Sequence, residues 1–164
     1  RFRELSVVAN AQPLWAMNDA AMSELTVPFL GSERAGWQYP FGSLERAGAQ
    51  IAIGIDWPVS SPNPLLLMHV AVNRSSWETG PDVPAAEREV FLGSERLTLA
   101  SALRAATLGS AYGNHLDAVT GSVEVGKLAD LVVLDRNIFA EPASEIAQAR
   151  VDQTFVEGTC VFGG

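Results

Sequence analysis

Cysteine, histidine and long apolar runs are all scarce in this chain of 164 residues. Its single cysteine, Cys160, excludes an internal disulfide and any zinc site built from several cysteines. We expect a packed, inert thiol there, and cysteine scarcity fits a cytoplasmic location. No apolar run approaches the roughly 20 residues that a membrane helix needs, so we expect no membrane contact.

Positive charge is also in short supply. Eleven Lys and Arg residues face nineteen Asp and Glu residues, for a net charge of −8. Such a surface repels phosphate backbones, so a nucleic-acid partner is not expected. The chain is 48% hydrophobic and 18% charged, which is typical of a folded protein and excludes a disordered one. It begins at Arg1 without a signal peptide, and we expect a fragment of a longer protein.

The first two thirds of the chain read as an α/β fold. Residues 49–56 (AQIAIGID) are an apolar run, apart from Gln50, that ends in Asp56, and such a run is typical of a parallel strand covered on both faces. A second strand is expected over residues 6–13, and a helix over 41–49, with Ser43 as its N-cap, separates the two. Strand, helix and strand form the unit of α/β folds. Two further helices are expected, at residues 98–107 and, inside a long loop over 14–40, at 18–25. Residues 65–74 can form a buried helix or a strand, and their length and proline-rich entry favour the helix.

The last 45 or so residues change character. Glu157-Gly158 separates two short apolar runs and predicts a hairpin over residues 151–162. Two more short strands are expected around the turn at Gly126-Lys127, over residues 122–125 and 129–135. We therefore divide the chain into residues 1–117 and 118–164.

Asp56 is the main candidate for chemistry. It follows the apolar strand directly, and active sites of parallel α/β barrels lie at the carboxyl ends of the strands. A carboxylate there can bind a metal or move a proton. The competing interpretation is that Asp56 caps the proline-containing turn that follows it. Trp57, next to it, is the best candidate for a substrate pocket.

The two histidines do not point to a metal site of their own. A zinc hydrolase needs about three protein ligands, and His69 and His115 have no metal-ligand spacing such as His-x-His. A packed position for His69 and a surface position for His115 are the simpler interpretations. Phosphate-binding loops and Gly-x-Ser-x-Gly elbows are missing too.

Two motifs carry a family resemblance. SLERAGAQIAIGIDWPVSSPNPL (residues 43–65) resembles the last barrel strand and loop of the amidohydrolase superfamily, family 3, in its YtcJ-like or N-substituted formamide deformylase-like branch. GSVEVGKLADLVVLD (residues 121–135) resembles a second recurrent amidohydrolase motif. Ile55 departs from the pattern, because relatives usually carry Ser there.

The resemblance implies the C-terminal part of a (β/α)8 TIM barrel with metal-dependent hydrolase architecture, plus strands of a small β-sandwich as in urease-like composite domains. It also implies a divalent metal, with zinc expected, bound in the complete protein. Of the family's ligands only the last aspartate falls in this chain, at Asp56, where it binds or neighbours the metal and shuttles a proton. The other ligands are expected in a missing N-terminal segment or subunit, and a homo-oligomer is possible.

Two functions remain open at this stage. One is hydrolysis of a small-molecule C–N bond, in a non-peptide amide or formamide-type substrate, by metal-activated water with Asp56 as proton shuttle. The other is a catalytically incomplete barrel fragment that acts as a structural or interaction module, since a partial barrel leaves strand edges and apolar faces to be covered.

Overall fold

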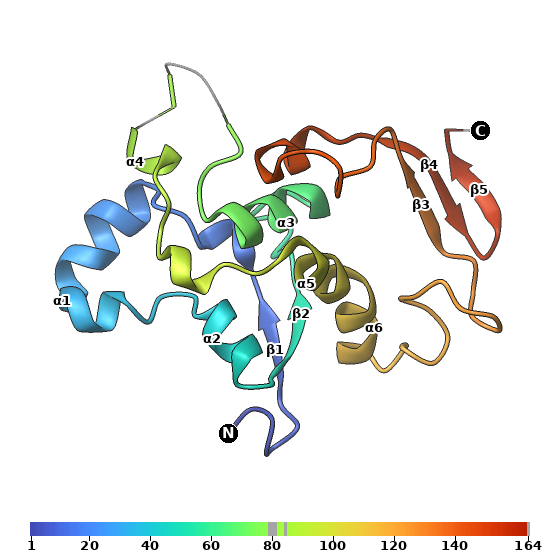
Figure 1. Ribbon diagram of the computed structural model, residues 1–164, viewed down its shortest axis with the longest axis horizontal. Coiled ribbons are helices and arrows are strands. Elements are labelled where there is room, and N and C mark those ends of the chain that lie inside the picture. Colours follow the sequence, from blue (N-terminus) through green and yellow to red (C-terminus); the bar gives the residue numbers. More distant parts are fainter. Residues whose placement is uncertain (79–81, 84, 164) are drawn as a thin grey trace.

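The computed structural model describes residues 1–78, 82–83 and 85–163. Two separate sheets organise them: a parallel pair, β1 and β2, and an antiparallel sheet in the order β3-β4-β5. The parallel pair lies among helices, whereas the antiparallel sheet projects to one side (Figure 1). The strands are β1 (Val8–Ala11), β2 (Gln50–Ile53), β3 (Leu131–Leu134), β4 (Val151–Val156) and β5 (Thr159–Phe162). The α-helices are α1 (Val27–Ala35), α2 (Phe41–Arg46), α3 (Pro64–Asn73), α4 (Ala85–Arg88), α5 (Leu99–Arg104) and α6 (Ser110–Gly113). Tighter or wider helical turns are η1 (Pro13–Trp15), η2 (Ala21–Thr26), η3 (Gly93–Glu95), η4 (Ala105–Gly109) and η5 (Ala143–Gln148).

The parallel pair forms the centre of the packed region. β1 and β2 run in register from Val8 opposite Gln50 to Ala11 opposite Ile53. Side chains alternate between the two faces of a strand. On one face of the pair, Ala9, Ala11, Ile51 and Ile53 all belong to the main core. Helix α3 adds Leu67, Met68 and Val70 to the same core. The predicted order of strand, helix and strand is confirmed.

The outer edge of β2 is covered by a helical segment. Gly54 donates its N–H to Ala11 of β1, so the carbonyls of Ile51 and Ile53 point away from β1. The Ser110 hydroxyl donates to the Ile53 carbonyl at 3.0 Å. Gly109 lies so close to the Ile51 carbonyl that a side chain there would collide with it. The continuous helical stretch from α5 through η4 to α6 therefore occupies the place of a neighbouring strand.

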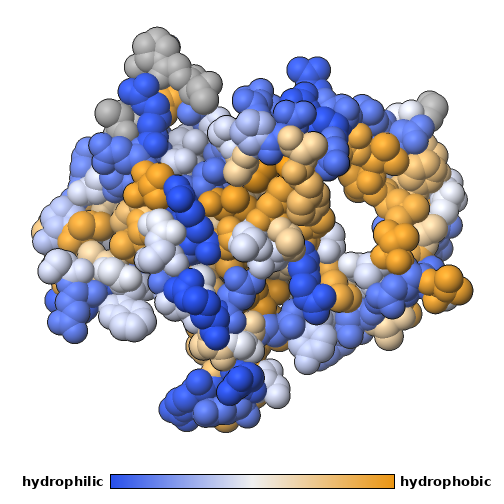
Figure 2. Space-filling model, in the orientation of Figure 1, coloured by the Kyte–Doolittle hydropathy of each residue, from blue (hydrophilic) through white to orange (hydrophobic). Residues whose placement is uncertain are grey.

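The antiparallel sheet is exposed. β4 and β5 form the predicted hairpin, and Glu157 and Gly158 both adopt the positive φ values that a tight hairpin turn favours. Apolar side chains on this sheet stay in solvent: Val132 is 57% exposed and Val161 58%. Figure 2 shows apolar surface around an opening between this sheet and the helices. The expectation of a packed Cys160 is wrong, because β5 is an exposed edge strand and the thiol is exposed with it.

Several expected boundaries change. Residues 122–125 form no strand. Val123 and Val125 are almost fully exposed, and no strand among the described residues pairs with that segment. The segment after β1 is far more helical than expected, because η2 continues directly into α1 and Pro28 stands in its first turn. Ser43 is not an N-cap, since α2 begins at Phe41 and Ser43 binds another group.

Other helix boundaries follow the sequence closely. Asn63 caps α3 by accepting a hydrogen bond from the N–H of Leu65, and Thr98 caps α5 through the N–H of Ser101 at 3.1 Å. The α5 helix then continues through η4 and α6, well past the predicted end at residue 107.

The division at residues 117 and 118 stays a prediction. Three residues of the second part, Ile138, Ile146 and Ala149, belong to the same apolar cluster as α3 and the parallel strands. In the described part of the chain, no helix is long and apolar enough to cross a membrane.

Candidate active site

Asp56 lies three residues beyond the carboxyl end of β2, in the loop that leads to α3. Its backbone has a φ of 52°, a left-handed conformation that Asp tolerates better than most residues. The Asp56 carbonyl accepts the N–H groups of Val59 and Ser60 at 2.9 and 3.2 Å, and the Ser60 hydroxyl binds the Ile55 carbonyl. The turn is therefore held by main-chain carbonyls.

The Asp56 carboxylate is exposed and makes no hydrogen bond or ion pair with any described residue. A capping role for this side chain, the competing interpretation, finds no contact to support it. The carboxyl group is therefore free to meet a ligand at the end of a parallel strand.

Asn10 stands at the same end of the neighbouring strand. Its side chain is exposed and packs over Gly54. A Cβ at residue 54 would lie 2.7 Å from the Asn10 Oδ1 atom, so glycine is required for this approach. Asn10 was not among the residues predicted from the sequence, although a polar residue between Ala9 and Ala11 in an apolar strand is a usable signal.

Trp57 follows Asp56 and is 66% exposed. Two shallow hollows lie at the other end of the sheet, where Gln50 lines both. The pocket role of Trp57 stays a prediction.

The histidines take the two positions expected of them. His69 is buried in α3, with Nδ1 unpartnered, and burial lowers its pKa. His115 is exposed. Within the described ranges, no group of three or more His, Cys, Asp or Glu side chains is close enough to hold a metal ion. Of the candidate site residues, only Asp56 thus offers a free carboxylate, and a protein zinc site needs more ligands than that.

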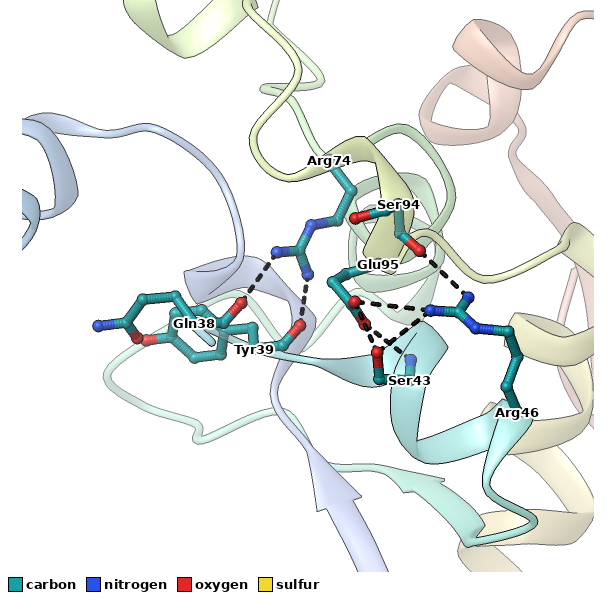
Figure 3. Close-up of polar contacts among 7 residues, drawn as sticks. All are labelled: Gln38, Tyr39, Ser43, Arg46, Arg74, Ser94 and Glu95. Carbon is teal, nitrogen blue, oxygen red and sulfur yellow. Dashed lines mark hydrogen bonds and ion pairs between the residues drawn. The ribbon is translucent and has the colours of Figure 1, made fainter. Parts of the chain in front are cut away.

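A second polar cluster is fully engaged and is structural. Arg74, at the end of α3, is 0% exposed, and burial lowers its pKa to about 10. Its guanidinium donates to the Phe91 carbonyl at 2.9 Å. It also donates to the carbonyls of Tyr39 and Gln38 at 3.0 and 3.3 Å (Figure 3). It also lies 5.4 Å from the Phe41 ring centre.

Glu95 completes this cluster. Its carboxylate accepts the N–H and the hydroxyl of Ser43, both at 2.7 Å, and pairs with Arg46 at 3.5 Å (Figure 3). Since every charged group here already has partners, the cluster ties α2, α3 and the segment around η3 together and leaves no group for a ligand.

The recurrent motif at residues 121–135 is also structural. Lys127 donates to the Ser122 hydroxyl at 2.6 Å, and its side chain is only 12% exposed. Asp130 accepts the Thr120 hydroxyl and the Glu157 N–H, which lowers its pKa. These contacts join the loop to the hairpin turn.

Comparisons with known proteins place this geometry in a family. A family model described as "Amidohydrolase family" matches residues 1–162. The protein LONG AFTER FAR-RED 3 of Arabidopsis thaliana is 37% identical over 99% of this chain and 26% of its own length. N-substituted formamide deformylase of Arthrobacter pascens is 30% identical over 73% of this chain and 20% of its own length. The chain thus spans about a quarter of these relatives.

Solved structures agree. A metal-dependent hydrolase of Pyrococcus furiosus, itself uncharacterized, superposes with a TM-score of 0.64 at 28% identity, over 83% of this chain and 25% of that one. An amidohydrolase of Thermotoga maritima shares the fold with a TM-score of 0.50 at 22% identity, over 74% of this chain and 25% of that one. With a family match over almost every residue, the chain belongs to the amidohydrolase family.

Proposed function

We propose that this chain is the C-terminal part of a metal-dependent amidohydrolase that hydrolyses a non-peptide C–N bond, and that Asp56 is its proton-transfer residue. One observation carries the proposal. The Asp56 carboxylate lies beyond the end of a parallel strand, exposed and without a partner among the described residues. Carboxylates in that position serve chemistry in α/β barrels.

The proposed reaction divides its tasks between this chain and its surroundings. A divalent metal, when bound, polarises the carbonyl and favours ionisation of water. Asp56 can contribute one ligand oxygen, and the other ligands come from outside these residues. The Asp56 carboxylate accepts a proton from the attacking water and returns it to the leaving nitrogen, so that an amine is released and Asp56 is regenerated.

The substrate class follows from a relative. The Arthrobacter enzyme is named for N-substituted formamides, and an amide or formamide-type substrate fits an acid that must protonate a departing nitrogen. Imidazolonepropionase of Micrococcus luteus, 64% identical over 39 residues, covers only 24% of this chain and 10% of its own length. A formamide-type amide is therefore the substrate to test first.

The proposed architecture assigns β1 and β2 to the closing strands of a (β/α)8 barrel, and β3–β5 to a small β-sandwich. In its support, the sheet β3–β5 presents apolar side chains that a second layer can cover, such as Val132 and Val161.

The decisive experiment is Asp56→Asn in the full-length protein, assayed on an N-alkylformamide. We expect kcat to fall about 10²- to 10⁴-fold, because the amide cannot take the proton. The matched control is Asp152→Asn, at an exposed aspartate of β4 without described partners, which should keep full turnover. Unchanged turnover in the Asp56→Asn variant would reject the proposal.

An interaction module is the second candidate, favoured by the exposed apolar sheet and by the lack of a metal-ligand group among the described residues. Zinc content separates the two functions. If residues 1–164 mixed with the remainder of the protein restore both stoichiometric metal and activity, the chain is a part of the enzyme. A stable, metal-free and inactive complex would favour the module.

A further inference from the structure

Two polar side chains stand uncommitted at the carboxyl end of the parallel pair. Asp56 follows β2, and Asn10 lies in the neighbouring strand β1, opposite Ala52 of β2. Both are exposed, and neither side chain has a hydrogen bond to any residue the structure describes. Their hydrogen-bonding capacity is therefore open to a ligand, unlike that of the buried Arg74 cluster, whose groups already bind protein partners.

The Asn10 carboxamide is held close to the chain that leads to Asp56. A Cβ on Gly54 would lie 2.7 Å from Asn10 Oδ1 and 3.2 Å from Nδ2. The carboxamide thus fills the space that a side chain at residue 54 would take. Gly54 is only two residues before Asp56, so the carboxamide lies next to the segment that carries the proton-transfer group.

The chemistry of the Asn10 carboxamide suits one kind of ligand, a secondary amide. A carboxamide offers one acceptor, Oδ1, and two donors on Nδ2, without charge. A secondary amide has the complementary N–H donor and carbonyl acceptor. A tertiary amide has lost the N–H. We propose that Asn10 is a specificity-determining residue that accepts the substrate N–H on Oδ1, and that the site therefore selects secondary over tertiary amides; this rests on the proposed function.

The test compares two substrates in the full-length protein, an N-alkylformamide and its N-methyl-N-alkyl counterpart. We expect the wild type to prefer the first. Asn10→Ala should lower kcat/KM for the secondary amide about 10- to 100-fold, chiefly through KM, because one substrate hydrogen bond is lost. Activity on the tertiary amide should change less than about twofold. The ratio of the two kcat/KM values does not depend on the folded fraction, so a loss of stability cannot imitate this result.

Gln50→Ala is the matched control. Gln50 is another side-chain amide of the same sheet, at the opposite end of β2, and its removal should leave the substrate preference unchanged.

Gly54→Ala probes the geometry from the other strand. Its methyl group should push the carboxamide aside and reduce the preference in the same direction as Asn10→Ala. The double variant should then resemble Asn10→Ala alone, because the two changes remove one interaction. Additive losses in the double variant would overturn the assigned contact.

The two proposals fail in different ways. A wild type that hydrolyses neither amide, with or without added zinc, rejects the proposed function and this inference with it. A wild type that hydrolyses the secondary amide, together with an Asn10→Ala variant that keeps the same preference, rejects the role of Asn10 alone.

Discussion

The two sheets of this chain are both built from largely apolar strands, but the parallel pair is buried and the antiparallel sheet is exposed to solvent. In the parallel pair, Ile51 is 6% exposed and lies under helices. In the antiparallel sheet, Val132 is 57% and Val161 58% exposed. Apolar composition therefore predicts a strand but not its cover, which depends on whether the same chain supplies a second layer.

The polar contacts of the two regions differ in burial too: those of the packed region are buried, and those of the antiparallel sheet lie at the surface. Arg74 is completely buried and holds three main-chain carbonyls. Asp135 binds Arg136 and the N–H of Arg150 at the surface, at 3.0 and 2.9 Å. Charges screened by water contribute little to stability, whereas a buried group that loses its partner is costly. The packed region should therefore respond far more strongly to substitution than the antiparallel sheet.

Arg74→Ala should produce the largest loss. It leaves the carbonyls of Gln38, Tyr39 and Phe91 without a donor and opens a cavity, so we expect about 3–5 kcal/mol lower free energy of unfolding. Urea denaturation followed by circular dichroism measures it. Arg104→Ala, at an exposed arginine of α5 without a described partner, should stay within about 0.5 kcal/mol. Similar values for both variants would remove the contrast between buried and surface charge.

Leu67→Ala and Val161→Ala compare the apolar side chains directly. Leu67 is 1% exposed, and its truncation should cost about 2–5 kcal/mol. Truncation of Val161 should cost less than about 0.5 kcal/mol, because its methyl groups already meet water. Thermal unfolding of the two variants gives the difference. A large cost at Val161 would mean that the antiparallel sheet is covered in solution.

Acid should loosen the two regions at different pH values. Burial lowers the pKa of His69 in the folded protein. Below about pH 6.5 the unfolded chain therefore binds a proton at His69 more readily than the folded chain does, and the free energy of unfolding falls. Arg136 and the Arg150 N–H lower the pKa of Asp135 to about 2. Its contribution is complete above its ordinary pKa of 3.8 and is lost as the pH falls toward 2.

Amide hydrogen exchange along the chain measures this order. Protection in α3 should weaken as the pH falls below about 6.5, while β3 and β4 keep theirs until the pH nears 3.8, the ordinary pKa of Asp135. His69→Leu should abolish the first step only, and Asp135→Asn the second only. If both regions lost protection together at one pH, a single shared group would be responsible.

Local chemistry made much of this fold predictable. The apolar run before Asp56, the Thr98 cap and the Glu157-Gly158 turn each encode their structure within a few residues, and all three have the predicted form. Of the candidate site, the sequence predicted the place of Asp56 at the end of a strand, because the strand pattern stops there.

What the sequence did not reveal depends on partners far away along the chain. Glu95 accepts a hydrogen bond from Ser43, 52 residues away in the sequence, and Arg74 donates one to Tyr39, 35 residues away. The place of Asn10 beside Gly54 follows only from the register of two strands more than 40 residues apart. Residues 122–125 have strand composition but no strand to pair with, so their apolar side chains remain in water.

The helical cover on β2 has a consequence for assembly. With Gly109 and Ser110 against the carbonyls of Ile51 and Ile53, this sheet can grow only past β1. The proposed closed barrel would give every strand two strand neighbours, so its completion would require the helix to leave that edge. Joining this chain to the rest of the protein would then exchange one hydrogen-bonding partner of β2 for another, at a rate set by how readily the helix detaches.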